Sequence, residues 1–281
     1  TMVFQNYALF PHLTVFENIA YGPKIRRESA NDIRRKTEEI MGLVGLEGFE
    51  ERSPAQLSGG QQQRVSLARS LIMEPKVLLL DEPLSNLDAK LRVSTRLEIR
   101  KIQQRVGITS VYVTHDQEEA MTLSDRVVIM HEGKIMQIGT PQEIYAHPVN
   151  RFVADFIGKA NFLKGQVTAM RSDDTLEIEI MGKKIIAPVH NGALTEGAGV
   201  LLVLRPESVR LESKKPDTLT GIIREAVYLG SQMVYEVDLA ENIITVEIAN
   251  PQEHIVFNTG EEVTLTFQEK NLHILPYEKE V

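Results

Sequence analysis

The sequence contains no cysteine among its 281 residues. This absence excludes disulfides, zinc sites built on thiolates and a cysteine nucleophile, and it fits a reducing compartment. Long hydrophobic runs are also missing, because the longest uninterrupted one extends only from Val200 to Leu204. A membrane-spanning helix needs roughly 18 or more apolar residues. If the protein works at a membrane, we therefore expect it to dock on other subunits.

A surplus of basic residues is missing as well. The chain has 31 Lys and Arg against 39 Asp and Glu, a formal net charge of −8. Residues 1–160 hold 20 basic and 20 acidic side chains, so the whole surplus of acid lies in the second part. Binding of nucleic acid needs a concentrated basic face, and this distribution argues against it.

The first 160 residues alternate between helical and strand patterns, which is typical of an α/β domain. Helices are predicted over 29–44, where Ser29 and Asp32 form a capping pattern, and over 60–73, 87–106 and 117–123. The short apolar runs at 76–81 and 110–114 indicate strands buried on both faces of a parallel sheet. Residues 126–138 indicate a β-hairpin with its turn at Glu132 and Gly133.

The pattern changes after residue 158. From 162 to 275, short alternating strands such as 175–180 and 263–267 are separated by Gly, Pro, Asn and Asp turns. This is typical of a small β-barrel or sandwich. We therefore predict an α/β domain over 1–158, with a helical subdomain at about 12–75, and a β-rich domain over 159–281.

Two carboxylates, Asp81 and Glu82, close the apolar run at 77–80. In α/β proteins, ligands bind at the carboxyl ends of parallel strands. Asp81 is placed to hold Mg²⁺ through water, and Glu82 is suited to orient or deprotonate an attacking water. For an isolated Asp-Glu pair, the alternative is a solvated acidic turn after a core strand.

A glycine pair precedes a predicted helix in the segment Ser58-Gly59-Gly60-Gln61. Free backbone N–H groups and the positive end of the helix dipole face any anion that docks there. Glycine also lets the backbone approach a ligand closely. Taken alone, the segment is equally consistent with a flexible helix cap.

In this order and spacing, the segments resemble the motifs of an ABC-type ATPase. Residues 57–61 resemble its signature motif, 78–83 its Walker B strand, 85–88 its D-loop and 114–116 its switch histidine, while Gln5 and 7–12 resemble its Q-loop. Residues 160–281, with Leu204-Arg205-Pro206-Glu207, resemble the oligonucleotide-fold accessory (TOBE) domain of importers of the sugar, polyamine and ferric-iron type. The implied fold is an α/β P-loop NTPase-like domain, incomplete at its N-terminus, with a helical subdomain and followed by a β-rich OB-like domain.

The resemblance implies ATP and Mg²⁺ as cofactors and gives roles to single residues. Glu82 and His115 are expected to be catalytic, with His115 donating to the γ-phosphate and fixing Glu82 and the water. Gln5 and Asp81 are expected at the metal. The other expected nucleotide contacts, which form across a dimer of ATPase domains, are Ser58, Gly59, Gly60, Gln61 and Asp88.

Several of these residues have structural alternatives. His115 is also suited to be a helix cap, and Asp88 to be the N-cap of the long helix that follows it. The resemblance places residues 6–12 against a membrane subunit, whereas Tyr7, Leu9 and Phe10 are equally suited to ordinary core packing.

The glycine-rich phosphate cradle Gly-x-x-x-x-Gly-Lys-[Ser/Thr] is absent. The Gly-Lys pairs at Gly133, Gly158 and Gly182 are followed by Ile, Ala and Lys. Because the cradle supplies most backbone contacts to the phosphates, we expect the chain to bind ATP weakly or not at all in its own site and to be inactive alone. We interpret the sequence as an N-terminally truncated portion of a transport ATPase.

The leading hypothesis is an energy-coupling subunit of a bacterial ABC importer at the cytoplasmic face of the plasma membrane. Its expected partners are transmembrane permease subunits, a second ATPase subunit in a homodimer or a mixed pair, and indirectly a periplasmic or lipid-anchored solute-binding protein. No nucleic-acid partner is expected. The alternatives are a non-enzymatic regulatory or ligand-sensing fragment and a soluble ABC ATPase acting on nucleic acid or ribosomes. The transported solute is left open.

Overall fold

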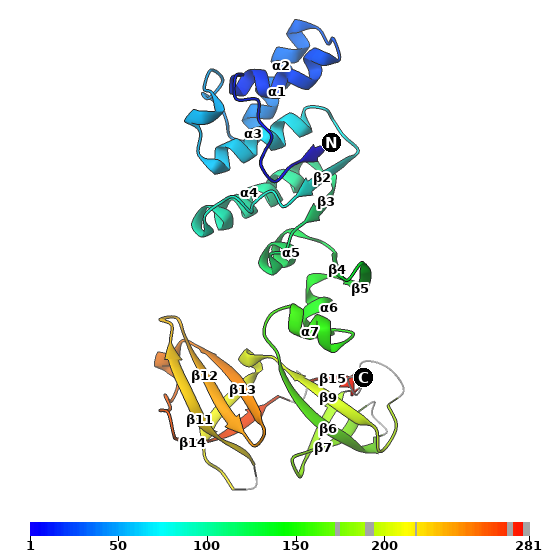
Figure 1. Ribbon diagram of the computed structural model, residues 1–281, viewed down its shortest axis with the longest axis vertical. Coiled ribbons are helices and arrows are strands. Elements are labelled where there is room, and N and C mark those ends of the chain that lie inside the picture. The colour runs from blue at the N-terminus through cyan, green and yellow to red at the C-terminus, as the bar shows by residue number, and fades with distance from the viewer. Residues whose placement is uncertain (172–174, 189–193, 217, 269–271, 278–281) are drawn as a thin grey trace. The chain divides into compact units, whose positions relative to one another are not determined.

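The computed structural model describes residues 1–171, 175–188, 194–216, 218–268 and 272–277 (Figure 1). Contacts divide the chain into two compact units, Thr1–Asp125 and Arg126–Val281. The domain boundary expected near residue 159 lies within the second unit and stays a prediction. No helix in the described ranges combines the length and the apolar character that crossing a membrane requires.

The first unit contains a three-stranded parallel sheet in the order β1-β2-β3, formed by Met2–Val3, Val77–Asp81 and Thr109–Val113. Val3 is paired with Leu80, and Asp81 with Val113. Helix α4, Ala89–Val106, connects β2 to β3, and helix α5, Gln117–Leu123, follows β3. Because the strands are parallel, all three carboxyl ends lie at one edge of the sheet.

Three helices lie between β1 and β2 in the chain: α1, Val15–Ile25; α2, Ala30–Leu43; and α3, Gly59–Leu71. A short 3₁₀ helix, η1, covers Pro54–Gln56. Ser29 caps α2 by accepting from the Asp32 N–H at 3.2 Å, which confirms the predicted cap. The Asp32 carboxylate accepts from the Ser29 hydroxyl at 2.6 Å, so the described contacts form only half of the expected capping box. Helix α3 packs against α1 and buries residues of both its faces, including Val65, Ser66 and Ala68. The two helices predicted in this region, over 29–44 and 60–73, are present with their ends shifted by one or two residues, whereas α1 was not predicted.

One prediction about the sheet is wrong. Leu78 and Leu80 of β2 are buried, but the residues alternating with them are not, so β2 is covered on one face only. Strand β3 has a similarly open face. The exposed residues, each 41% or more accessible, are Val77, Leu79, Val111 and Val113. An apolar run identifies a strand, but it does not show that both faces are covered.

The second unit begins with a hairpin of β4, Val127–His131, and β5, Lys134–Gly139. Its turn has positive φ at Glu132 (47°) and Gly133 (75°), which confirms the predicted turn. Two short helices follow, α6, Pro141–Ala146, and α7, Arg151–Phe156.

The rest of the second unit is two five-stranded antiparallel sheets (Figure 1). The sheet β15-β9-β6-β7-β8 comprises His273–Pro276, Gly199–Leu204, Asn161–Met170, Thr175–Ile180 and Lys183–Pro188. The sheet β10-β14-β11-β12-β13 comprises Val209–Ser213, Glu262–Phe267, Leu219–Tyr228, Gln232–Leu239 and Asn242–Ala249. Two 3₁₀ helices, η2 at Pro206–Ser208 and η3 at Pro251–Glu253, complete the unit. One hydrophobic cluster includes Ile178 and Leu202 from the first sheet and Val237 and Val263 from the second, so the sheets share a core.

Arg205 joins the short helices to these sheets. Its guanidinium donates to the backbone carbonyls of Ala154 at 2.8 Å, Lys159 at 3.0 Å and Tyr145 at 3.0 Å. It also lies 4.2 Å from the centroid of the Tyr145 ring. Burial lowers the pKa of Arg205, but three carbonyl acceptors satisfy its donors.

Candidate functional site

Four of the predicted site residues lie at the carboxyl edge of the parallel sheet. Gln5 follows the end of β1 by two residues, Asp81 is the last residue of β2, and His115 follows the end of β3 by two residues. Glu82 directly follows Asp81. Three segments that are far apart in sequence thus reach one edge, as expected for an α/β protein.

The side chain of Glu82 contacts residues from both neighbouring segments. Its Oε1 lies 3.1 Å from Nδ1 of His115, and its Oε2 accepts from Nε2 of Gln5 at 3.5 Å. Glu82 is 30% exposed and His115 73% exposed, so both side chains remain open to solvent. The structure therefore brings together Gln5, Glu82 and His115, with Asp81 beside them in the chain.

Glu82 has a strained backbone, because its φ of 43° is in the left-handed region. Its N–H donates to the Val113 carbonyl at 2.9 Å, which ties it to β3. Its carbonyl accepts from the N–H and the hydroxyl of Ser85 at 3.3 and 2.9 Å. Such strain costs about 1–3 kcal/mol and persists where neighbouring contacts over-determine the conformation.

The loop that carries His115 is fixed by its two neighbours. The Thr114 hydroxyl accepts from the Asp116 N–H at 2.9 Å and donates to the Glu119 carboxylate at 2.8 Å. Asp116 caps α5 by accepting from the Glu119 N–H at 3.1 Å. Asp116 is therefore the helix cap, and the alternative cap role for His115 is wrong.

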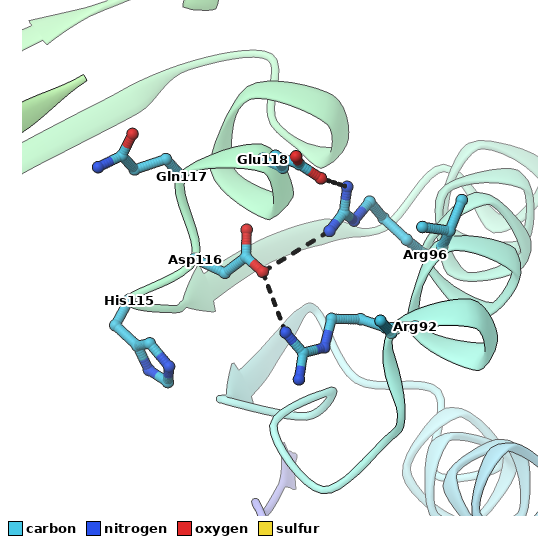
Figure 2. A pocket seen from close by; sticks show the side chains of 8 residues that line it. Arg92, Arg96, His115, Asp116, Gln117 and Glu118 are labelled. Carbon is cyan, nitrogen blue, oxygen red and sulfur yellow. Dashed lines mark hydrogen bonds and ion pairs between the residues drawn. The ribbon is translucent and has the colours of Figure 1, made fainter. Parts of the chain in front are cut away.

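Asp116 also connects this loop to α4. Its Oδ2 lies 3.3 Å from Nη1 of Arg92 and 3.8 Å from Nη2 of Arg96, and Arg96 also pairs with Glu118 at 3.2 Å. Figure 2 shows the side chain of Asp116 directed at both guanidinium groups. These residues line an open pocket of about 470 Å³ with Ala89, Val93, His115 and Gln117.

Glu119 holds the same loop from the buried side. It is 3% exposed and accepts from the Tyr112 hydroxyl at 2.9 Å as well as from Thr114. Burial and the neighbouring Glu119 carboxylate raise the pKa of Tyr112 well above its usual range, so the phenol stays protonated and donates.

The glycine segment forms the start of α3. Ser58 and Gln61 make a reciprocal capping box, in which each side chain accepts from the other's backbone N–H. A Cβ on Gly59 would lie 2.8 Å from Leu87 Cδ2, and one on Gly60 would lie 3.2 Å from Leu91 Cδ1. No hydrogen bond or ion pair among the described residues joins this segment to Glu82. Its predicted contact with a nucleotide stays a prediction.

Asp88 is the N-cap of α4, accepting from the Leu91 N–H at 3.0 Å. This confirms the structural alternative for Asp88, while its role across a dimer interface stays a prediction. Tyr7 is buried at 6% exposure in the core of the first unit, which confirms core packing there. Leu9 packs against the same core as a partly buried residue.

Sequence reasoning missed three residues that shape the site. Asn86 donates to the Gln5 carbonyl at 2.9 Å, Arg92 contacts Asp116, and Arg69 of α3 donates to carbonyls of residues 7 and 8. Asn86 and Arg92 lie within or close to the motif at 85–88, yet nothing in one sequence indicates that their partners are 81 and 24 residues away.

The donor set is compatible with Mg²⁺. This ion is usually bound by one or two carboxylates together with phosphate oxygens and water. Asp81 and Glu82 supply two adjacent carboxylates at the strand end, and Gln5 adds an amide that already contacts one of them. No group of three or more His, Asp or Glu side chains among the described residues forms a closed metal cage.

Comparison with known proteins gives two family matches. Residues 1–85 match the model described as ABC transporter, and residues 202–275 match the TOBE domain. The second match agrees with the β-rich fold of the second unit. The first covers Gln5, the glycine segment at 58–61 and both carboxylates at the strand end.

Full-length relatives are also similar. The chain is 47% identical over 82% of its length to "Spermidine/putrescine import ATP-binding protein PotA" of Marinobacter nauticus, of which it covers 62%. It is 44% identical over 94% of its length to the protein of the same name in Ruegeria pomeroyi, covering 72% of that protein. It is 44% identical over 98% of its length to "Fe(3+) ions import ATP-binding protein FbpC" of Rhizobium etli, covering 76%. The chain thus spans less than two thirds of the first of these relatives.

Proposed function

The chain belongs to the ABC transporter family, and on this premise we propose that it is part of the ATP-hydrolysing, energy-coupling subunit of a bacterial importer. The observation that carries the proposal is the Glu82 carboxylate, placed at the strand end between Gln5 and His115. A carboxylate with an imidazole at 3.1 Å is suited to take a proton from an attacking water.

The proposed roles divide among four side chains. Glu82 orients and deprotonates the water, His115 holds Glu82 and donates to the terminal phosphate, and Gln5 with Asp81 faces Mg²⁺. When bound, Mg²⁺ would neutralise charge that develops on the phosphates. The exposure of Glu82 and His115 supports these roles, because both are open to an incoming ligand.

We place the working unit in a dimer of ATPase domains. Among the described residues, no hydrogen bond or ion pair joins the segment Ser58–Gln61 or the N-cap Asp88 to Glu82. Ser58 and Asp88 are exposed, Gly59 and Gln61 are half-buried, and Gly60 is buried. In the proposed dimer these residues complete the site of the opposite subunit. The N-terminal end of α3 is suited to this, since helix N-termini favour phosphate.

The names of the relatives support a proposal about partners and cargo. We propose that the subunit docks on transmembrane permease subunits at the cytoplasmic face of the plasma membrane and serves, through them, a solute-binding protein. The relatives' names point to polyamines or ferric iron as the solute class.

The test is Glu82→Gln in the complete gene product, with ATP hydrolysis measured as phosphate release at saturating Mg²⁺. We expect turnover to fall by about two orders of magnitude or more, since general-base catalysis contributes typically 10²–10⁴-fold. The matched control is Glu132→Gln, a glutamate that also has positive φ (47°) but lies in the β4–β5 turn. Undiminished turnover in the Glu82 variant, or an equal loss in both variants, would contradict the proposal.

A further inference from the structure

The segment just after Gln5 has an unusual backbone. Tyr7 and Ala8 are consecutive and both left-handed, with φ of 59° and 46°. Neither residue is glycine, and a left-handed L-residue is disfavoured because its Cβ crowds the following carbonyl. The Tyr7 hydroxyl is also buried with no hydrogen-bond partner among the described residues. The segment therefore needs compensating contacts.

Those contacts come from α3. The Tyr7 carbonyl accepts from Ser66 Oγ at 2.9 Å and from Arg69 Nη2 at 2.9 Å, and the Ala8 carbonyl accepts from Arg69 Nη1 at 2.7 Å. A guanidinium group can donate to two successive carbonyls at once, because its N–H donors lie in one fixed plane. Ser66 is fully buried.

Among the described residues, Arg69 has no other hydrogen-bond or ion-pair partner. Its guanidinium carbon lies 5.3 Å from the centroid of the Phe10 ring. Burial lowers the pKa of Arg69, so its charge is held there at some cost rather than in water. The contacts of Arg69 with residues 7, 8 and 10 therefore stabilise the conformation of this segment.

The left-handed pair lies between Gln5 and the rest of the helical region. Asn86 donates to the Gln5 carbonyl at 2.9 Å, so the β2–α4 turn holds the backbone of Gln5. Helix α3 holds the backbone of Tyr7 and Ala8 through Arg69. The same helix α3 begins with the capping box of Ser58 and Gln61. One rigid element thus connects the glycine segment to the backbone that carries Gln5.

We propose that Arg69, with Ser66, is a positioning residue that clamps the Tyr7-Ala8 turn and thereby sets the side chain of Gln5 against Glu82. The proposal rests on the proposed function only in naming Gln5 as a ligand of Mg²⁺ or water. The clamp itself is a property of this chain and is measurable without nucleotide.

The experiment compares Arg69→Gln with Arg64→Gln in the 281-residue chain. Arg64 lies on the same helix, but its ion pair is to Glu98, at 3.4 Å. NMR measures hydrogen exchange at the Tyr7 and Ala8 amides and the resonances of the Gln5 side-chain amide. We expect exchange about tenfold or more faster and shifted Gln5 resonances in Arg69→Gln only, because two charge-assisted hydrogen bonds are lost. Unchanged exchange or unshifted resonances would overturn the proposal.

Ser66→Ala provides a second variant if Arg69→Gln does not fold. It removes one of the three donors to these carbonyls and leaves a small side chain on a buried helix face. Exchange at Tyr7 should then rise several-fold, and no rise would equally overturn the clamp.

Activity supplies a separate readout. In the complete gene product, Arg69→Gln should lower kcat and raise the Mg²⁺ concentration for half-maximal hydrolysis, with the KM for ATP changed less. A fall in kcat without a change in Mg²⁺ requirement would contradict the positioning role. If the wild-type product hydrolyses no ATP, the proposed function fails, while the exchange and the Gln5 resonances still decide the clamp.

Discussion

Asp116→Asn tests how the His115 loop is held. The two carboxylate oxygens of Asp116 serve different partners: Oδ1 caps α5 through the Glu119 N–H, and Oδ2 accepts from Arg92 and faces Arg96. Asparagine has a single side-chain oxygen, so it can keep the cap or the contact with Arg92, but not both.

The expected loss of stability comes from the hydrogen bond between Arg92 and Asp116, which Asn cannot keep while it also caps α5. Asn caps helices about as well as Asp, so the cap alone predicts little change. The lost interaction is a hydrogen bond to a charged group, worth about 1.5–3 kcal/mol. Arg96, whose side chain is 7% exposed, keeps its ion pair with Glu118, while Arg92 loses its ion pair with Asp116. We therefore expect the free energy of unfolding to fall by about 2 kcal/mol.

Urea unfolding followed by far-UV circular dichroism measures this change, because α1 to α5 all lie in the first unit. With an m-value of about 2 kcal/mol/M, the midpoint should fall by about 1 M. The control is Asp125→Asn, which removes the ion pair with Arg100; the Asp125 side chain is 74% exposed. A pair this exposed contributes about 0–1 kcal/mol. Equal midpoints for the two variants would refute the reasoning.

Two further predictions concern single residues with unusual environments. Ala8 and Ala240 have φ of 46° and 51°, so we expect Ala8→Gly and Ala240→Gly each to leave the free energy of unfolding unchanged or to raise it by less than about 1 kcal/mol. The reason is that relief of the left-handed strain outweighs the entropy that glycine adds to the unfolded chain. Thermal unfolding measures this, and a loss above about 1 kcal/mol at Ala8 would mean that the turn is not left-handed in solution. Burial and the hydrogen bond to Glu207 raise the pKa of Tyr145 to about 12. Because the folded-state pKa is raised, the stabilisation is complete below the unfolded pKa of 10.0 and is lost as pH rises through about 12. Absorbance titration at 295 nm should show this late transition in the wild type and not in Tyr145→Phe.

Local sequence patterns predicted α2 to α5, β2, β3 and the β4–β5 hairpin, but not α1, α6 or α7. Ser29 and Ser58 begin helices because their side chains accept backbone N–H groups, a rule that needs no tertiary information. The Glu132-Gly133 turn was equally predictable from its residues. The burial of each strand residue was not predictable in this way. Val77 and Leu79 are as apolar as Leu78 and Leu80, yet only Leu78 and Leu80 are buried, because burial depends on which other elements pack against that face.

In the candidate site, too, some features could be predicted from the sequence and others could not. Residues that end parallel strands must meet at one edge, so Gln5, Glu82 and His115 could be placed together from their motifs. The side chains that support them could not. Arg69 and Arg92 contact loops 61 and 24 residues away, and arginine on a helix face is most often only solvated. Their roles depend on three-dimensional neighbours that a single sequence does not encode locally.

Left-handed backbone recurs at this edge of the sheet. Tyr7, Ala8 and Glu82 are all left-handed non-glycine residues close to Gln5, and the carbonyls of Tyr7 and Glu82 each accept two hydrogen bonds. At about 1–3 kcal/mol each, such conformations are lost from a chain unless the surroundings enforce them. The donors come from α3 at Tyr7 and Ala8, and from Ser85 of the β2–α4 turn at Glu82. On the proposed clamp, a change at Arg69 in α3 therefore reaches the contact between Gln5 and Glu82 without touching Glu82.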